Sequence, residues 1–228
     1  MHHAHPRAPR RTHKGSRLRF SSARTLVLAA HTDDEFGCAG LIGRLVEQGT
    51  EVHVACFSWC EESVPEGYER DVLKGEAQAA MAVLGIAPDR FRLYDYRVRH
   101  FPAHRQELLE ELVVLRRAIE PDLVLVPSSS DIHQDHGVVA QEGTRAFKHA
   151  TILGYELPMN TISFRHAAFV PLEERHMDLK IAHAAAYVSQ QQRPYMNPDF
   201  LRGLALVRGV QINRSGAEAF EVIRMVAD

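Results

Sequence analysis

Apolar residues along the chain fall into short continuous runs that alternate with amphipathic stretches. The first run, residues 25–30, is typical of a buried parallel strand and precedes a predicted helix over 36–48. Three similar units follow, with strands predicted over 51–58, 91–96 and 122–127, and helices over 68–84, 104–119 and 137–148. Because strands and helices alternate in order, the pattern favours an α/β fold with a mostly parallel sheet and helices on both faces.

The last third of the chain is less regular, and it predicts a mixed α+β arrangement. Strands are expected over 152–157 and 167–170, a helix over 172–188, and a closing strand over 219–226. Neither an internal repeat nor an interdomain linker interrupts the pattern. We therefore expect one domain over residues 23–228.

Polar side chains follow two of the predicted buried strands at the point where each strand ends. The carboxyl ends of parallel strands meet at one edge of a sheet, where α/β proteins bind ligands. The two clusters should therefore lie together, and they comprise His31, Asp33, Asp34, Glu35, Asp131, His133, Asp135 and His136.

Imidazole and carboxylate groups in such a cluster are typical of a metal site. A catalytic zinc ion takes about three protein ligands, which His31, Asp34 and His136 would supply. The remaining carboxylate of Asp33 would accept a proton from an activated water, and His133 would act as an acid or polarise a carbonyl. Zn²⁺ is the expected metal, with Fe²⁺, Co²⁺ or Mn²⁺ as alternatives.

Other interpretations of these residues remain open. Asp33 or Asp34 alone could cap the following helix, although two clusters, each directly after a buried strand, are harder to explain as caps. Two histidines and one carboxylate also form the facial triad of non-haem Fe(II) oxygenases, but the α/β pattern disfavours their usual all-β scaffold. A metal-dependent carbohydrate-binding module without turnover is a third interpretation, which the intact Asp33 and His133 disfavour.

Two motifs in these clusters resemble those of a known enzyme family. The segment Ala30-His31-Thr32-Asp33-Asp34-Glu35 resembles the AHPDDE signature of the PIG-L/LmbE-like zinc-dependent N-acetylglucosaminyl deacetylases, and residues 131–136 resemble that family's D-x-H-x-D-H motif. The resemblance continues through Lys180, residues 187–190 and residues 217–220. It implies a Rossmann-like fold and a hydrolase that releases acetate from an N-acetylated amino sugar or its conjugate.

The resemblance also implies a role for each matched residue. His31, Asp34 and His136 would bind the metal, Asp33 would be the general base and His133 the acid or electrophile. Asp135 would orient an imidazole, and Glu35 would be structural. The chain departs from the family at Thr32, where proline is usual and where we expect a looser turn. It departs again at Leu73, three residues before Glu76, where the family often has a substrate-binding arginine.

Contacts with the substrate are less firmly indicated by the sequence. Trp59 follows the second strand and is a candidate for the wall of a sugar pocket. Tyr155 is expected near the pocket from the resemblance alone. Arg97 and Arg99 follow the third strand at alternate positions, and guanidinium groups bind phosphate in a bidentate arrangement. They suggest that the small-molecule substrate is an anionic conjugate.

Charge and cysteine content narrow the class of protein. Seven of the 27 basic residues lie in residues 1–24, which contain no acid, so the rest of the chain carries 20 basic against 29 acidic residues. Such an acidic body is a poor surface for nucleic acid, and the basic segment 1–22 is predicted to be a disordered tail. Three cysteines and the lack of a long apolar run favour a cytoplasmic protein without a transmembrane segment, and a homo-oligomer is compatible with the pattern.

Overall fold

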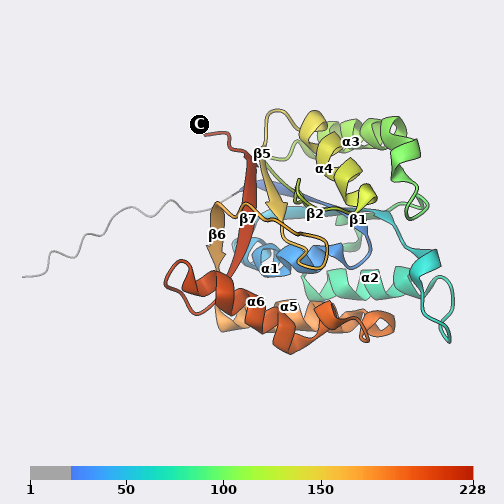
Figure 1. Ribbon diagram of the computed structural model, residues 1–228. Helices are drawn as coiled ribbons and strands as arrows, with labels where there is room; N and C mark the ends of the chain where they lie inside the picture. The colour runs from blue at the N-terminus through green and yellow to red at the C-terminus, as the bar shows by residue number, and fades with distance from the viewer. Residues whose placement is uncertain (1–21, 228) are drawn as a thin grey trace, which may run out of the picture.

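The computed structural model describes residues 22–227, and the predicted tail lies outside them except for Ser22. These residues form one sheet of seven strands with helices around it (Figure 1). The strands are β1 (Arg24–His31), β2 (Glu51–Ser58), β3 (Phe91–Leu93), β4 (Leu123–Pro127), β5 (Thr151–Tyr155), β6 (Ala168–Pro171) and β7 (Ala217–Arg224).

The strand order is β3-β2-β1-β4-β5-β7-β6. The first five strands in this order are parallel to one another, while β7 is antiparallel to both β5 and β6. The predicted α/β fold with a mostly parallel sheet is therefore confirmed, and the irregular last third supplies β6 and the one reversed strand, β7. The sheet order reverses between β1 and β4, which is the topological switch point where open α/β sheets bind ligands.

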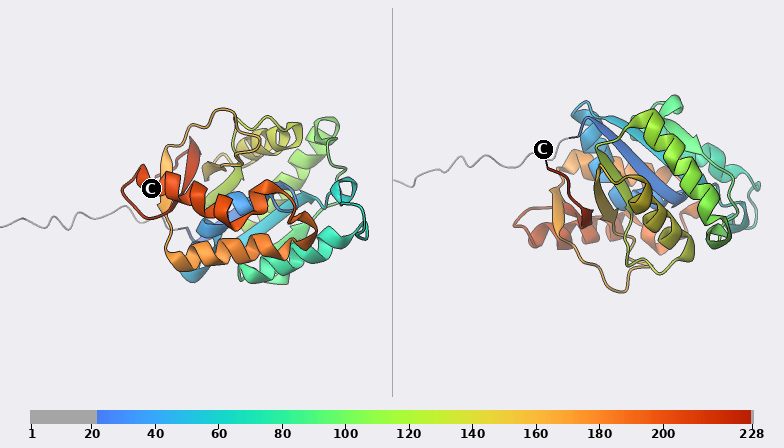
Figure 2. Two further views of the ribbon diagram at one scale, coloured as in Figure 1. Left: turned by 60° about the horizontal axis from the view of Figure 1, so that its bottom comes forward. Right: turned by 90° about the horizontal axis from the view of Figure 1, so that it is seen from above.

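Helices cover both faces of the sheet, as the two views of Figure 2 show. Helices α3 and α4 lie on one face, and α1, α2, α5 and α6 lie on the other (Figure 1). Their bounds are α1 (Ala39–Glu47), α2 (Val72–Val83), α3 (Arg105–Ile119), α4 (Gln134–Ala146), α5 (Glu174–Ala186) and α6 (Pro198–Val210). Within residues 22–227 no helix has both the length and the apolar character needed to cross a membrane.

Each face of the sheet has its own apolar core. Val27 and Leu125 belong to the core beneath α1, α2 and α5, whereas Leu26, Leu28 and Val124 belong to the core beneath α3 and α4. Successive side chains of a strand point to opposite faces, so a strand covered on both faces must be apolar throughout. This explains why residues 25–30 form a continuous apolar run.

Two differences from the predicted elements bear on the site. The predicted helix 36–48 begins instead as a tight 3-10 turn, Asp34–Cys38, before α1 starts. Helix α6 was not predicted, because only Leu201, Ala205 and Gly209 of it are buried and several of its apolar residues face solvent. It packs against β7 and covers the antiparallel end of the sheet.

A buried ion pair fixes the start of α1. Lys180 Nζ of α5 lies 2.7 Å from Glu218 Oε1 of β7, and both side chains are buried. The same carboxylate accepts hydrogen bonds from the backbone N–H groups of Gly40 and Leu41 at 2.9 and 2.7 Å. Three elements are thus held together by one carboxylate whose charge is fully compensated.

Removal of this carboxylate should destabilise the fold. We expect Glu218→Ala to lower the free energy of unfolding by about 3 kcal/mol, because the Lys180 ammonium group would stay buried without a counter-ion. Urea denaturation measures this change. The control is Arg202→Ala, which breaks exposed pairs with Glu174 and Asp178 and should cost less than about 1 kcal/mol. Equal small losses in both variants would contradict the expectation.

Candidate metal centre

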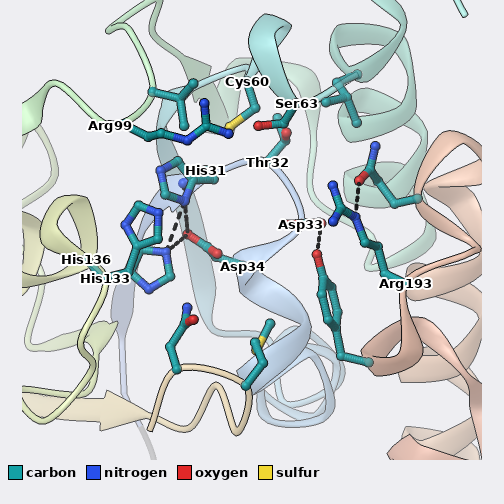
Figure 3. Close-up of a pocket in the computed structure, with 16 residues that line it drawn as sticks. His31, Thr32, Asp33, Asp34, Cys60, Ser63, Arg99, His133, His136 and Arg193 are labelled. Carbon is teal, nitrogen blue, oxygen red and sulfur yellow. Dashed lines mark hydrogen bonds and ion pairs between the residues drawn. The ribbon is translucent and has the colours of Figure 1, made fainter. Parts of the chain in front are cut away.

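The two polar loops meet at the carboxyl ends of β1 and β4. These strands are neighbours in the sheet and pair in parallel, with Val27 opposite Leu125. The pairing brings His31 at the end of β1 next to His133 and His136 at the start of α4 (Figure 3). The predicted juxtaposition of the two clusters is therefore what the structure shows.

Three side-chain atoms converge at this point. His31 Nδ1 lies 3.0 Å from His136 Nε2, and Asp34 Oδ2 lies 3.6 Å from the first and 3.3 Å from the second. Ligands of a tetrahedral zinc ion, each about 2.0–2.2 Å from the metal, are separated from one another by about 3.4 Å. The spacing of the three atoms fits a common metal ion.

Two buried carboxylates set the orientation of the imidazoles. Asp135 Oδ2 lies 2.9 Å from His31 Nε2, and Asp131 Oδ2 lies 2.7 Å from His136 Nδ1. Each carboxylate accepts an N–H from the ring, so the lone pairs of the other two nitrogens face each other across 3.0 Å. Two facing lone pairs need a cation between them, which is a proton in the metal-free protein and otherwise a metal ion.

His133 is a further nitrogen donor near this point. One ring nitrogen each from His31, His133 and His136 lie within 4.8 Å of one another. The backbone N–H of Asp135 donates to His133 Nδ1 at 3.2 Å, so a neutral ring carries its proton on Nε2. Burial, followed by the charges of His136 and His31, lowers the pKa of His133 to about 4, which keeps the ring neutral.

The 3-10 turn after β1 explains how Asp34 reaches the centre. Asp33 has a left-handed backbone with φ of 83°, which turns the chain back so that Asp34 Oδ2 accepts the His31 N–H at 2.8 Å. Neither Asp33 nor Asp34 caps a helix with its side chain. The Thr32 N–H donates to Ser58 O at 3.1 Å, a bond that proline could not make. That Thr32 loosens the turn stays a prediction.

Asp33 lies apart from the histidines, on the other side of the cavity (Figure 3). The Tyr195 hydroxyl donates to Asp33 Oδ2 at 3.4 Å. Burial, reinforced by the charges of Asp34 and Glu35, raises the pKa of Asp33 well above its usual range. Glu35 itself is buried behind the site, where it contacts the Tyr187 hydroxyl and His183 Nε2.

A cavity of about 240 Å³ opens over the centre. His31, Asp33, Asp34, His133 and His136 all line it. Part of its wall comes from the C-terminal third of the chain, which sequence reasoning did not identify. These lining residues are Met159, Asn160, Gln190, Arg193 and Tyr195.

The four predicted substrate contacts have different outcomes. Arg99 lines the cavity, whereas Arg97 and Trp59 do not. Arg97 Nε is instead bonded to Glu62 Oε1 at 2.7 Å, and the Trp59 ring packs under Lys74 Nζ at 3.9 Å.

The expectation that Tyr155 contacts the substrate is wrong, because its side chain is fully buried and its hydroxyl donates to Leu28 O at 3.0 Å. Its ring packs beneath the 3-10 turn that follows β1. A Cβ added at Gly37 would lie 2.8 Å from the Tyr155 ring and 2.9 Å from Glu156 O, so only glycine fits there.

The family's arginine has no counterpart at Leu73, which lines the cavity as an apolar residue. Arg70 is exposed and lies 3.4 Å from Glu61, and Lys74 covers Trp59, so neither reaches the cavity. The two arginines that do line it are Arg99 and Arg193.

Comparison with known proteins gives matches in sequence and in fold. Residues 26–147 match the family model described as PIG-L, GlcNAc-PI de-N-acetylase. A 4-oxalmesaconate hydratase of Pseudomonas putida KT2440 is 30% identical over 143 residues, covering 58% of this chain and 54% of the hydratase. The chain thus spans about half the length of that relative. An uncharacterised deacetylase, YaiS, of Escherichia coli K12 is 25% identical over 162 residues, covering 69% and 86% of the two chains.

Solved structures share the fold. The N,N'-diacetylchitobiose deacetylase from Pyrococcus horikoshii superposes with a TM-score of 0.69 at 18% identity, covering 89% of this chain and 84% of that enzyme. At this identity the likeness concerns the fold alone.

Metal affinity of this centre should rise with pH. Burial lowers the pKa of His136, but the charges of Asp34 and Asp131 outweigh it and raise the pKa to about 10 in the metal-free protein. Near neutral pH a metal ion must therefore displace a proton from His136. We expect affinity for Zn²⁺ to increase about tenfold per pH unit between pH 7 and 9. Calorimetry in buffers of different ionisation enthalpy measures the proton released, and an affinity independent of pH would contradict a ligand role for His136.

Proposed function

Because the chain belongs to the PIG-L family, we propose that it is a zinc-dependent N-deacetylase that releases acetate from an N-acetylated amino sugar or its conjugate. The observation that carries the proposal is the convergence of His31 Nδ1, Asp34 Oδ2 and His136 Nε2 within 3.6 Å of one another. A carboxylate is bonded to the far nitrogen of each imidazole, as is usual for histidines that bind a metal.

These three residues would hold the metal in our proposal. A divalent ion bound there supplies a Lewis acid that polarises a carbonyl and makes water nucleophilic near neutral pH. Nitrogen and oxygen donors suit Zn²⁺ and also accept Fe²⁺, Co²⁺ or Mn²⁺. The metal therefore has to be identified by experiment.

The other polar residues of the cavity would move and hold protons. Asp33 is the proposed general base, because its raised pKa brings the carboxyl group toward the pH at which it can take and return a proton. His133 is the proposed electrophile, since its neutral ring presents the Nε2–H as a donor to an oxygen that gains negative charge. Between the two earlier alternatives for His133, the geometry favours this role over that of an acid.

Hydration of an unsaturated acid is a second candidate function. It is favoured by the 30% identity with a hydratase and by two arginines in the cavity, Arg99 and Arg193. Hydration would use the same base and the same metal. Loss of ultraviolet absorbance from a conjugated unsaturated carboxylate measures hydration, whereas acetate appears only in deacetylation.

The proposed function is tested by an acetate-release screen. Free, nucleotide-linked and glycosidic N-acetylamino sugars are each incubated with chelator-treated protein and one added divalent metal. We expect acetate from at least one substrate, with no release in chelator alone. Absence of acetate with every metal, together with hydration of an unsaturated acid, would overturn the deacetylase in favour of the second candidate.

Loss of any one ligand should abolish metal binding and activity together. We expect His31→Ala, Asp34→Ala and His136→Ala each to retain little metal after purification, because two ligands hold zinc poorly. Metal content is measured by elemental analysis alongside turnover. His104→Ala, which removes an exposed histidine outside the cavity, is the control and should keep both. Full metal occupancy in a ligand variant would exclude that residue from the metal site.

Replacement of the base should separate metal binding from catalysis. We expect Asp33→Asn to keep the metal and to lose about a hundredfold or more in rate, the usual scale of general base catalysis. Asparagine tolerates the left-handed backbone at this position, so the turn should be preserved. Turnover near that of the unsubstituted protein would show that another group accepts the proton.

A further inference from the structure

The cavity over the candidate metal centre carries two arginines whose guanidinium groups donate no hydrogen bond to a carboxylate among residues 22–227. Arg99 lies beside His31, and Arg193 lies on the opposite side beyond Asp33 (Figure 3). Among residues 22–227 the Arg193 guanidinium group forms no ion pair, and its Nε lies 3.4 Å from Gln190 Oε1. Both cations therefore have donors free to face a ligand.

The pairing of Arg97 with Glu62 explains why the charge of Arg99 is not fully neutralised. The Arg97 Nε donates to Glu62 Oε1 at 2.7 Å, whereas Arg99 approaches the other oxygen of that carboxylate only to 4.0 Å. One carboxylate thus sits between two guanidinium groups and is bonded to the one outside the cavity. The inward-facing arginine has no full counter-ion of its own.

The backbone holds Arg99 in a strained conformation. Its φ is 69°, a left-handed value that residues other than glycine rarely adopt. The Arg99 N–H donates to Asp135 Oδ2 at 2.5 Å, and the same oxygen lies 2.9 Å from His31 Nε2. Three of the five non-glycine residues with positive φ in the described chain, Asp33, Cys60 and Arg99, line this cavity. Strain that is retained at a site, where glycine would relieve it, indicates a function for the side chain.

A buried network supports Arg193 from the other wall. Glu76 accepts hydrogen bonds from the backbone N–H and the hydroxyl of Ser189, both at 2.7 Å. The Gln190 amide donates to that hydroxyl at 3.1 Å, and its oxygen faces Arg193 Nε. The segment that carries Arg193 is thereby anchored to α2 rather than left as a free loop.

We propose that the cavity takes an anionic substrate, in which a carboxylate or phosphate binds Arg99 while Arg193 contributes positive charge from the opposite wall. Guanidinium groups bind either oxyanion through two parallel hydrogen bonds. The inference rests on the proposed function in that it takes the metal-centred cavity as the substrate site. It does not depend on which reaction follows.

Binding to the metal-loaded protein tests the proposal without requiring turnover. Calorimetry compares glucosamine with glucosamine 6-phosphate and with muramic acid, which adds a carboxylate. We expect at least one of the two acidic ligands to bind about tenfold or more tightly than glucosamine, and the two arms distinguish phosphate from carboxylate. If neither acidic ligand binds more tightly than glucosamine, the proposal is wrong.

Variants assign the preference to the arginines. We expect Arg99→Gln to weaken binding of the preferred acidic ligand about tenfold and Arg193→Gln a few-fold. The control Arg202→Gln, which changes an arginine outside the cavity, should not weaken it. Metal content should be unchanged in all three. A preference that survives in the Arg99→Gln, Arg193→Gln double variant would overturn the proposal.

Arg99→Gly separates recognition from folding. Glycine accepts the left-handed backbone, so the Tm should equal or exceed that of the unsubstituted protein while the acidic ligand binds more weakly. A lower Tm would mean that the Arg99 side chain is retained for stability, against the proposal.

Acetate release from the acetylated forms of the same ligands distinguishes the two proposals. Tight, arginine-dependent binding of the acidic ligand without acetate release would leave anion recognition in place and reject the deacetylase. Equal release of acetate from neutral and acidic substrates, with no binding preference, would support the deacetylase and reject anion recognition.

Discussion

The parallel pairing of β1 with β4 is the interaction on which the candidate centre depends. It brings His31 and His136, which are 105 residues apart in the chain, to within 3.0 Å. The sheet continues through β2 and β3 on one side and through β5 on the other, so the loops after the two central strands meet at the switch point. A slip of one residue in β1 would turn its side chains to the opposite faces and remove His31 from the centre.

Asp135 joins this centre to the loop after β3. Its carboxylate is fully buried and contacts His31 Nε2 together with the backbone N–H groups of Arg99 and Phe101. One side chain thereby fixes the tautomer of a metal-ligand candidate and the left-handed backbone of a cavity arginine. The two features are held by a common support, which makes the cavity a preorganised site.

Much of this arrangement follows from the sequence, because strand burial and loop chemistry leave local signals. The continuous apolar runs predict the parallel strands. The polar residues after these runs predict the side chains that meet at the switch point. Which carboxylate supports which imidazole is a matter of three-dimensional packing, so the bond from Asp131 to His136 had no sequence signal. The expected substrate contact of Tyr155 is wrong because the resemblance does not indicate to which face of β5 this side chain points.

The sequence does not indicate Arg193 and Tyr195 as cavity residues, for a different reason. They lie in short turns between α5 and α6, where no hydrophobic period marks the chain. Only the packing of α5 against α1 and α2 brings this segment over the centre.

The cavity is assembled from two separate stretches of chain. His31, Asp33, Asp34, His133 and His136 fall within residues 26–147, the part matched by the family model, whereas Met159, Gln190, Arg193 and Tyr195 fall outside it. The candidate metal ligands therefore precede residue 148, whereas much of the opposing wall follows residue 158. Mutations after residue 147 can change this part of the wall and leave the candidate metal ligands in place, so the two parts of the site can evolve separately.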